Sequence, residues 1–142
     1  MKKLTSLLLA VMLLLTAALP VQAALPETAV PYYANTSQAS VSFVIEEDGS
    51  ASWTIMCTCK SSATGIYAVT YLERQVGNNW VRVDLDVPND QYTYSTTSKI
   101  FAQNNKHTFT EAGTYRAVVV FTVYGTTENE TLTFWNTHNF AG

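Results

Sequence analysis

The chain has 142 residues and carries eight basic and eleven acidic side chains, a net charge of −3 at neutral pH. Two of the basic residues lie in the first three positions, so the rest of the chain has six against eleven, a net charge of −5. Its few cations do not cluster in the sequence, and a domain of this charge repels phosphate backbones and anionic lipid surfaces. We therefore expect neither nucleic acid nor, once the leader is removed, a membrane as a partner.

The first 23 residues have the three parts of a secretory leader. Two lysines come first, an apolar run covers residues 7–18, and small residues stand at Val21 and Ala23, where a signal peptidase cuts. The apolar run is too short to span a hydrocarbon core of about 30 Å. We expect a signal peptide over 1–23, cleaved after Ala23, and a secreted, extracellular protein.

The remaining 119 residues are enough for one domain with its own core. Pro26 and Pro31 keep the beginning of this part extended, which predicts an N-terminal arm over residues 24–38. A folded domain is expected over residues 39–142.

The domain opens with a predicted β-hairpin. From Ser40 the apolar residues alternate with polar ones, and Asp48-Gly49 is a strong hairpin turn between two such runs. The residues expected to face inward are Val41, Phe43, Ile45, Trp53, Ile55, Cys57 and Cys59.

The only two cysteines, Cys57 and Cys59, lie on one face of the return strand. In an extended strand their Cα atoms are about 6.6 Å apart, near the upper limit for a disulfide. Two buried thiols that behave as small apolar side chains are one interpretation. A strained Cys-x-Cys disulfide and a metal site that lacks its other ligands are the alternatives.

The following region predicts several shorter strands. One runs over 66–76 with Tyr67, Val69 and Tyr71 facing inward, and a second runs over 80–86 until Pro88 ends it. Further strands are expected at 92–96, 99–102 and 131–138, with turns at 77–79 and 104–106 and with Leu132 and Phe134 facing inward.

The longest β-branched and aromatic run covers residues 111–125 and predicts a central strand. One of its faces is almost wholly apolar, and its members are Tyr115, Ala117, Val119, Phe121 and Val123. The chain thus has seven or eight short strands and no helical segment after the leader. We predict an all-β fold, an antiparallel β-sandwich of two packed sheets.

The segment Glu111-x-Gly113-Thr114-Tyr115-Arg116-Ala117 resembles the approach to strand F of immunoglobulin-like domains. The resemblance implies that Tyr115 bonds back to the preceding loop. It places Cys57 near the first family cysteine, Ala117 at the second and Tyr71 near the core tryptophan, so the family disulfide is absent. The wider pattern, with a hairpin over 71–81, resembles a group of small secreted bacterial immunoglobulin-like proteins of unknown function.

Motifs for catalysis are not found. His107 and His138 are the only histidines, and no local pattern places either beside a carboxylate and a nucleophile. We therefore expect no enzyme activity and two histidines on the surface; a small secreted enzyme or enzyme inhibitor is the second alternative function.

An acidic segment follows the predicted strand over 80–86. Asp84 and Asp86 share a strand face and Asp90 comes just after a proline, so their oxygens could hold Ca²⁺ at the edge of the sandwich. The alternative is an acidic edge strand that discourages aggregation. No other cofactor is expected.

Several aromatic side chains fall on faces expected to meet water. Trp135 and Tyr124 are the clearest, and Trp80 is ambiguous. Exposed rings on a sheet can stack on sugars or contact a protein partner, although they can also pack under the arm and the 89–105 segment. We expect a secreted, non-catalytic binding or adhesive module for an extracellular protein or glycan, with a carbohydrate-binding module as the first alternative.

Overall fold

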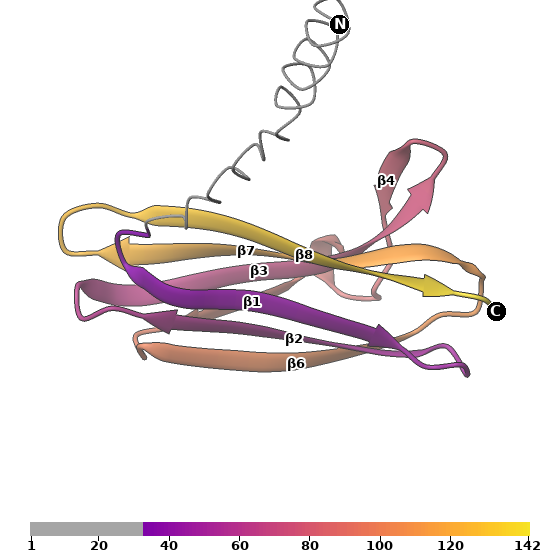
Figure 1. Ribbon diagram of the computed structural model, residues 1–142, viewed down its shortest axis with the longest axis horizontal. Helices are drawn as coiled ribbons and strands as arrows, with labels where there is room; N and C mark the ends of the chain where they lie inside the picture. Colours follow the sequence, from indigo (N-terminus) through magenta and orange to yellow (C-terminus); the bar gives the residue numbers. More distant parts are fainter. Residues whose placement is uncertain (1–32) are drawn as a thin grey trace, which may run out of the picture. The chain divides into compact units, whose positions relative to one another are not determined.

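The computed structural model describes residues 33–142, which form two antiparallel sheets packed face to face (Figure 1). The strands are β1 (Thr36–Ile45), β2 (Ser50–Cys59), β3 (Ala63–Val76), β4 (Asn79–Arg82), β5 (Tyr92–Thr96), β6 (Ile100–Thr108), β7 (Gly113–Gly125) and β8 (Glu130–Phe140), and a short 3-10 turn, η1, covers Pro88–Asp90. No helix within 33–142 is long and apolar enough to cross a membrane. The expected leader and most of the expected arm lie outside the described residues.

The two sheets have different sizes. One has three strands in the order β1-β2-β6, and the other has the order β4-β3-β7-β8. The fifth strand of this sheet is β5. It pairs with residues 66–70 of β3, and β4 pairs with residues 73–76 of the same strand. All pairs are antiparallel, so the prediction of an all-β antiparallel sandwich is confirmed, with eight strands.

The core lies between the two sheets and follows the alternation of the strands. The inner faces predicted for the first hairpin and for the central strand are confirmed, because every residue named for them is buried. The largest of those that are less than 2% exposed are Trp53, Phe121 and Ile55. Burial of the apolar face on each strand is what drives the two sheets together.

The inward face predicted for β3 is wrong. Tyr67, Val69 and Tyr71 lie on its half-buried outer side, while Ile66, Ala68, Thr70 and Leu72 face the core. Both sides of this strand are rich in apolar residues, so alternation alone does not choose between them, and a shift of one residue exchanges the two faces. The hydroxyl of the buried Thr70 has hydrogen-bond partners within the core, because it accepts from Trp53 and donates to the Val118 carbonyl.

The main differences from the predicted strand boundaries are in β1, β4 and β6. β1 begins at Thr36, three residues before the expected start of the domain, and β4 ends at Arg82 rather than at residue 86. The turn expected at 104–106 is wrong, because β6 continues through it in unbroken register with β2. Asn104 donates to the Thr54 hydroxyl (2.8 Å), so this polar segment gains side-chain bonds along the strand.

The first described residues are hydrogen-bonded to the beginning of β8 and to the connection that precedes it. The carboxylate of Glu130 accepts hydrogen bonds from the backbone N–H of Ala34 (2.7 Å) and Asn35 (3.3 Å) and from the Thr36 hydroxyl (2.7 Å). The Asn35 side chain in turn donates to the Glu128 carbonyl (2.9 Å). These bonds fix where the chain enters the sandwich.

Candidate binding face

The outer face of the larger sheet carries the most exposed aromatic ring of the described chain. We define the outer face as the side of β4, β3, β7 and β8 that points away from the core. Val118 on β7 lies opposite Tyr71 of β3 on one side and Trp135 of β8 on the other. Val118 is only 3% exposed although it points outward, so its neighbours cover it, whereas Trp135 is 61% exposed.

Two of the three arginines of the chain lie on this face, on strands next to β3 and near this ring. Glu73 on β3 lies opposite Arg82 of β4 and opposite Arg116 of β7. Arg74, the next residue of β3, points to the other side of the sheet and lies against Tyr115. Two cations that are far apart in the sequence are therefore neighbours in the fold. We call Arg82 and Arg116 the arginine pair.

Both members of the arginine pair stack on an aromatic ring of the outer face. The guanidinium carbon of Arg116 lies 4.3 Å from the ring centre of Trp80 and 5.9 Å from that of Trp135. The corresponding distance from Arg82 to Tyr71 is 3.3 Å. Stacking of this kind is favourable because the ring face is electronegative, and it holds both partners in place.

Two of the chain's three arginines have acidic partners. Arg116 bonds Glu73 through Nε (2.7 Å) and Nη2 (2.6 Å), and both side chains are largely covered. Arg74 pairs with Glu111. Across residues 33–142, Arg82 has no carboxylate partner, and its hydrogen bond is to the backbone oxygen of Asp90 at 3.5 Å.

The predicted ligand-binding aromatics separate into two places. Trp135 and Trp80 come together through Arg116, which lies between their rings. Tyr124 is on the same face and 41% exposed, but it is six residues along β7 from Val118, about 20 Å at ~3.4 Å per residue. Trp135 and Tyr124 are therefore both exposed on one face, but they do not lie side by side.

Hydroxyl groups border Trp135 along its own strand. Thr131, Thr133 and Thr137 alternate onto the same face of β8 and are exposed. Thr137 lies opposite Arg116 and Thr133 lies opposite Val120. The outer face thus combines a flat ring, guanidinium groups and a row of hydroxyls.

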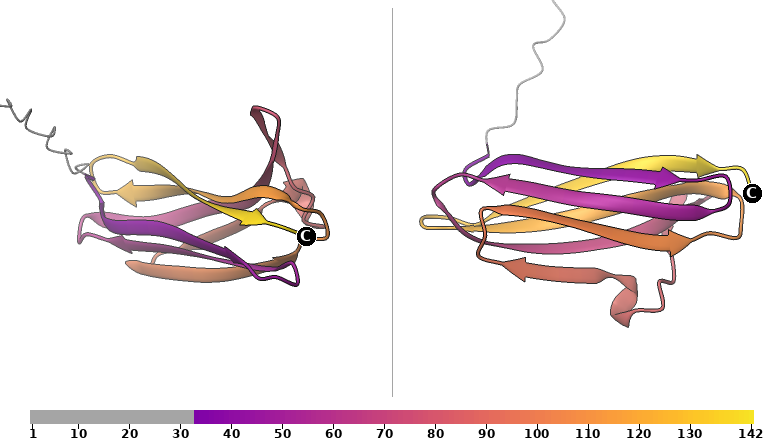
Figure 2. Two further views of the ribbon diagram at one scale, coloured as in Figure 1. Left: turned by 45° about the vertical axis from the view of Figure 1, so that its right-hand side comes forward. Right: turned by 90° about the horizontal axis from the view of Figure 1, so that it is seen from below.

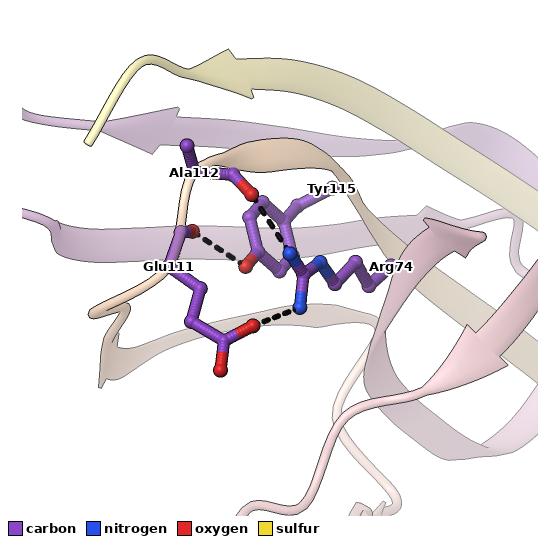
Figure 3. Close-up of polar contacts among 4 residues, drawn as sticks. All are labelled: Arg74, Glu111, Ala112 and Tyr115. Atoms are coloured by element: carbon purple, nitrogen blue, oxygen red, sulfur yellow. Dashed lines mark hydrogen bonds and ion pairs between the residues drawn. The ribbon is translucent and has the colours of Figure 1, made fainter.

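The connection before β7 is held by a tyrosine corner (Figure 3). The Tyr115 hydroxyl donates to the carbonyl of Glu111 (2.8 Å), and Arg74 Nη2 donates to the carbonyl of Ala112 (2.8 Å). Burial raises the pKa of Tyr115, and its ring packs 3.9 Å from that of Phe109. The bond expected for Tyr115 is present.

A groove of about 480 Å³ lies next to the tyrosine corner. The β3–β4 hairpin projects from the sandwich (Figure 1 and the left view of Figure 2), and the groove lies between this hairpin and the β6–β7 connection. Val76, Val81 and His107 are among its lining residues. The sequence could not predict it, because its two walls come from segments about thirty residues apart along the chain.

The acidic segment does not form the predicted strand. Asp84 and Asp86 follow the end of β4, and Asp84 Oδ1 accepts the backbone N–H of Asp86 (2.9 Å). Asp90 Oδ1 accepts the backbone N–H of Leu85 (3.2 Å). The shared strand face and the acidic edge strand are both wrong, and the described part of the chain contains no group of three or more His, Cys, Asp or Glu side chains placed to hold a metal.

Cys57 and Cys59 are two free, buried thiols whose Sγ atoms lie 3.8 Å apart. Burial, with a smaller contribution from Cys59, raises the pKa of Cys57 to about 12. Burial also raises the pKa of Cys59. Both thiols are therefore protonated at neutral pH, and they pack as apolar side chains.

Each of the two histidines packs edge-on against a phenylalanine ring. The ring centre of His107 is 4.9 Å from that of Phe109, and burial lowers the pKa of His107. His138 packs edge-on to Phe43, and its Nδ1 lies 3.2 Å from the carbonyl oxygen of Asn139. Both are half-buried rather than on the open surface.

No protein-family model, no curated protein and no solved structure matches this chain. Function is therefore inferred from the residues of the outer face.

Proposed function

We propose that this protein is a secreted, non-catalytic binding module with an immunoglobulin-like fold, and that its contact surface is the outer face around Trp135. One observation carries the proposal. Trp135 is 61% exposed and lies beside Arg116, which stacks between Trp135 and Trp80.

The outer face is suited to binding because it is both exposed and fixed. A large apolar side chain in water is unfavourable for folding, and aromatic rings and arginine are the side chains that contribute most at binding surfaces. The Arg116–Glu73 ion pair and the stacked rings hold these groups in one arrangement. Little conformational freedom is then lost when a ligand binds.

Three features support the immunoglobulin-like part of the proposal. The sheets have the orders β1-β2-β6 and β4-β3-β7-β8, in keeping with strands A-B-E opposite C′-C-F-G. Tyr115 forms its corner at the start of β7, in the place of strand F. Cys57 and Ala117 are fully buried on β2 and β7, the strands that a family disulfide would join. The leader predicted over 1–23 supports export.

Carbohydrate is the ligand class that the outer face favours. A sugar ring stacks its C–H face on an aromatic ring while its hydroxyls seek hydrogen-bond partners. Trp135 supplies the ring, and Thr133 and Thr137 supply hydroxyls on either side of it. A purely apolar protein contact would leave these hydroxyls without a role.

A glycan-array screen with the purified protein tests the proposal. We expect saturable binding that is lost in Trp135→Ala and retained in Tyr124→Ala, an exposed aromatic of the same face about 20 Å away. Circular dichroism establishes that both variants fold. Binding that is unchanged in Trp135→Ala would contradict the proposal, as would the absence of any glycan or extracellular protein that the parent binds.

A further inference from the structure

We propose that the ligand of the outer face is a polysaccharide that carries carboxylate groups, as uronic acids do, and that Arg82 binds such a carboxylate. This inference rests on the proposed function, since it names the ligand class for the same surface. It starts from a difference among the three arginines of the chain.

Arg74 and Arg116 each have a glutamate partner, whereas Arg82, within the described residues, has none. The carboxylates nearest to it along the chain already accept other hydrogen bonds. Asp84 accepts the N–H of Asp86, and Asp90 accepts the N–H of Leu85. The hydrogen bond from Arg82 to the Asp90 carbonyl, at 3.5 Å, is long and weak. Arg82 therefore retains donors for an external anion.

The stacking of Arg82 on Tyr71 prepares it for this role. The guanidinium carbon lies 3.3 Å from the ring centre, so the flat group rests on the outer face, and the side chain is exposed. A planar guanidinium binds a carboxylate through two parallel N–H···O bonds. Because the ring already restricts the side chain, less freedom is lost when an acid binds.

The distance from Arg82 to Trp135 fits one continuous ligand. Tyr71, Val118 and Trp135 lie side by side on three neighbouring strands, so two strand spacings of about 4.8 Å separate the ring under Arg82 from Trp135. A polysaccharide can stack one sugar on Trp135 while an acidic sugar of the same chain reaches Arg82. The exposed threonines of β8 favour a hydroxyl-rich polymer over an acidic peptide.

The overall charge does not favour a polyanion. From Ala24 onward the chain has a net charge of −5, so there is no long-range attraction to an acidic polymer. Recognition must therefore come from the direct contact with Arg82, and a change at this residue alone should abolish the preference for acidic sugars.

The test compares acidic polysaccharides with their neutral forms. Polygalacturonate and alginate are each titrated into the full protein beside their methyl-esterified forms, which keep the backbone but lack the charge. We expect esterification to weaken binding at least about tenfold, as the loss of a charge-assisted hydrogen bond does. Arg82→Gln should bind both forms equally, whereas Lys106→Gln, an exposed cation on the other sheet, should behave as the parent.

Equal binding of the acidic and esterified polymers by the parent, or an undiminished acid preference in Arg82→Gln, would overturn the inference. If neutral glycans then bind through Trp135, the proposed function survives and only the ligand class is wrong. Binding of poly-glutamate that depends on Arg82, without binding of either uronate, would replace the glycan by an acidic protein. If no binding depends on Trp135, both proposals fail.

Discussion

The indole N–H of Trp53 on β2 donates a 3.0 Å hydrogen bond to the hydroxyl of Thr70 on β3 and so joins the two sheets through the core. The Thr70 hydroxyl in turn donates a hydrogen bond to the carbonyl of Val118 on β7 (2.7 Å). Both side chains are almost wholly buried. The tryptophan of the core thus comes from β2. The family resemblance placed Tyr71 of β3 near the family's core tryptophan, but the neighbouring Thr70 faces the core there and accepts the hydrogen bond from Trp53.

Thr70→Val should lower the free energy of unfolding by about 2 kcal/mol, because it keeps the shape of the side chain but leaves the Trp53 N–H buried without a partner. Urea denaturation followed by tryptophan fluorescence measures this loss. Thr70→Ser keeps the hydroxyl and serves as the control for small changes in packing. A valine variant as stable as the parent would show that the bond contributes nothing to stability.

Glu130→Gln should loosen the entry of the chain into the sandwich. An amide offers one acceptor oxygen in place of two and turns a donor toward the N–H groups of Ala34 and Asn35. We expect a loss of about 1–2 kcal/mol and faster amide exchange at residues 34–36. Glu128→Gln is the matched control, since only its backbone oxygen is used. Equal exchange in the two variants would contradict this account of the contact.

Tyr115→Phe removes the bond to the Glu111 carbonyl and retains the ring that packs on Phe109. The expected cost is about 1 kcal/mol, with faster amide exchange in the connection before β7. Tyr124→Phe, on an exposed ring, is the control and should leave stability unchanged. If the two variants are equally stable, the tyrosine corner does not hold this connection.

The buried thiol of Cys57 should make the protein less stable at high pH. Its pKa is about 12 in the folded chain against a usual value of 9.0, so unfolding exposes a thiol that ionises more readily. The contribution to stability is complete below pH 9 and is lost as the pH rises from 9 toward 12. Denaturation midpoints between pH 8 and 11, compared with those of Cys57→Ala, measure the effect. A parent midpoint that falls no more steeply than that of the variant would contradict it.

The same pKa predicts slow labelling of the native thiol. At pH 8 a group of pKa about 12 is ionised in roughly one molecule in ten thousand, and only the thiolate reacts. Iodoacetamide should therefore modify Cys57 only as fast as the protein unfolds. Rapid labelling of Cys57 in the folded protein would be inconsistent with its burial.

The inward face of a strand could be predicted from the sequence only where the pattern within that strand distinguished its two faces. The faces of β1 and β2 were predictable because polar and apolar residues alternate along them, as around Phe43. The faces of β7 were predictable because one is almost wholly apolar, whereas the other includes Arg116 and Thr122. The faces of β3 were not, because Ile66, Ala68 and Leu72 alternate with residues that are equally apolar. The buried Thr70 gave no signal, since its partners come from other strands.

The binding face was predictable only in part for the same reason. The alternation of β8 indicated that Trp135 points away from the core. The contact of Arg116 with Trp80 and Trp135 depends on the order β4-β3-β7-β8, which local patterns do not contain. The order of the strands also brings Arg82 and Arg116 together on either side of Glu73, although they are more than thirty residues apart in the sequence.

The most direct test of the binding face uses the three indole N–H signals of the protein in a ¹⁵N NMR titration with the strongest binder from the glycan array. The rings differ in position: Trp53 is buried in the core, Trp80 is half-buried on the outer face and Trp135 is exposed there. We predict that the signals of Trp135 and Trp80 shift together in a saturable way while that of Trp53 stays in place. Saturable binding that leaves the Trp135 signal unmoved would contradict the assignment of the outer face as the contact surface.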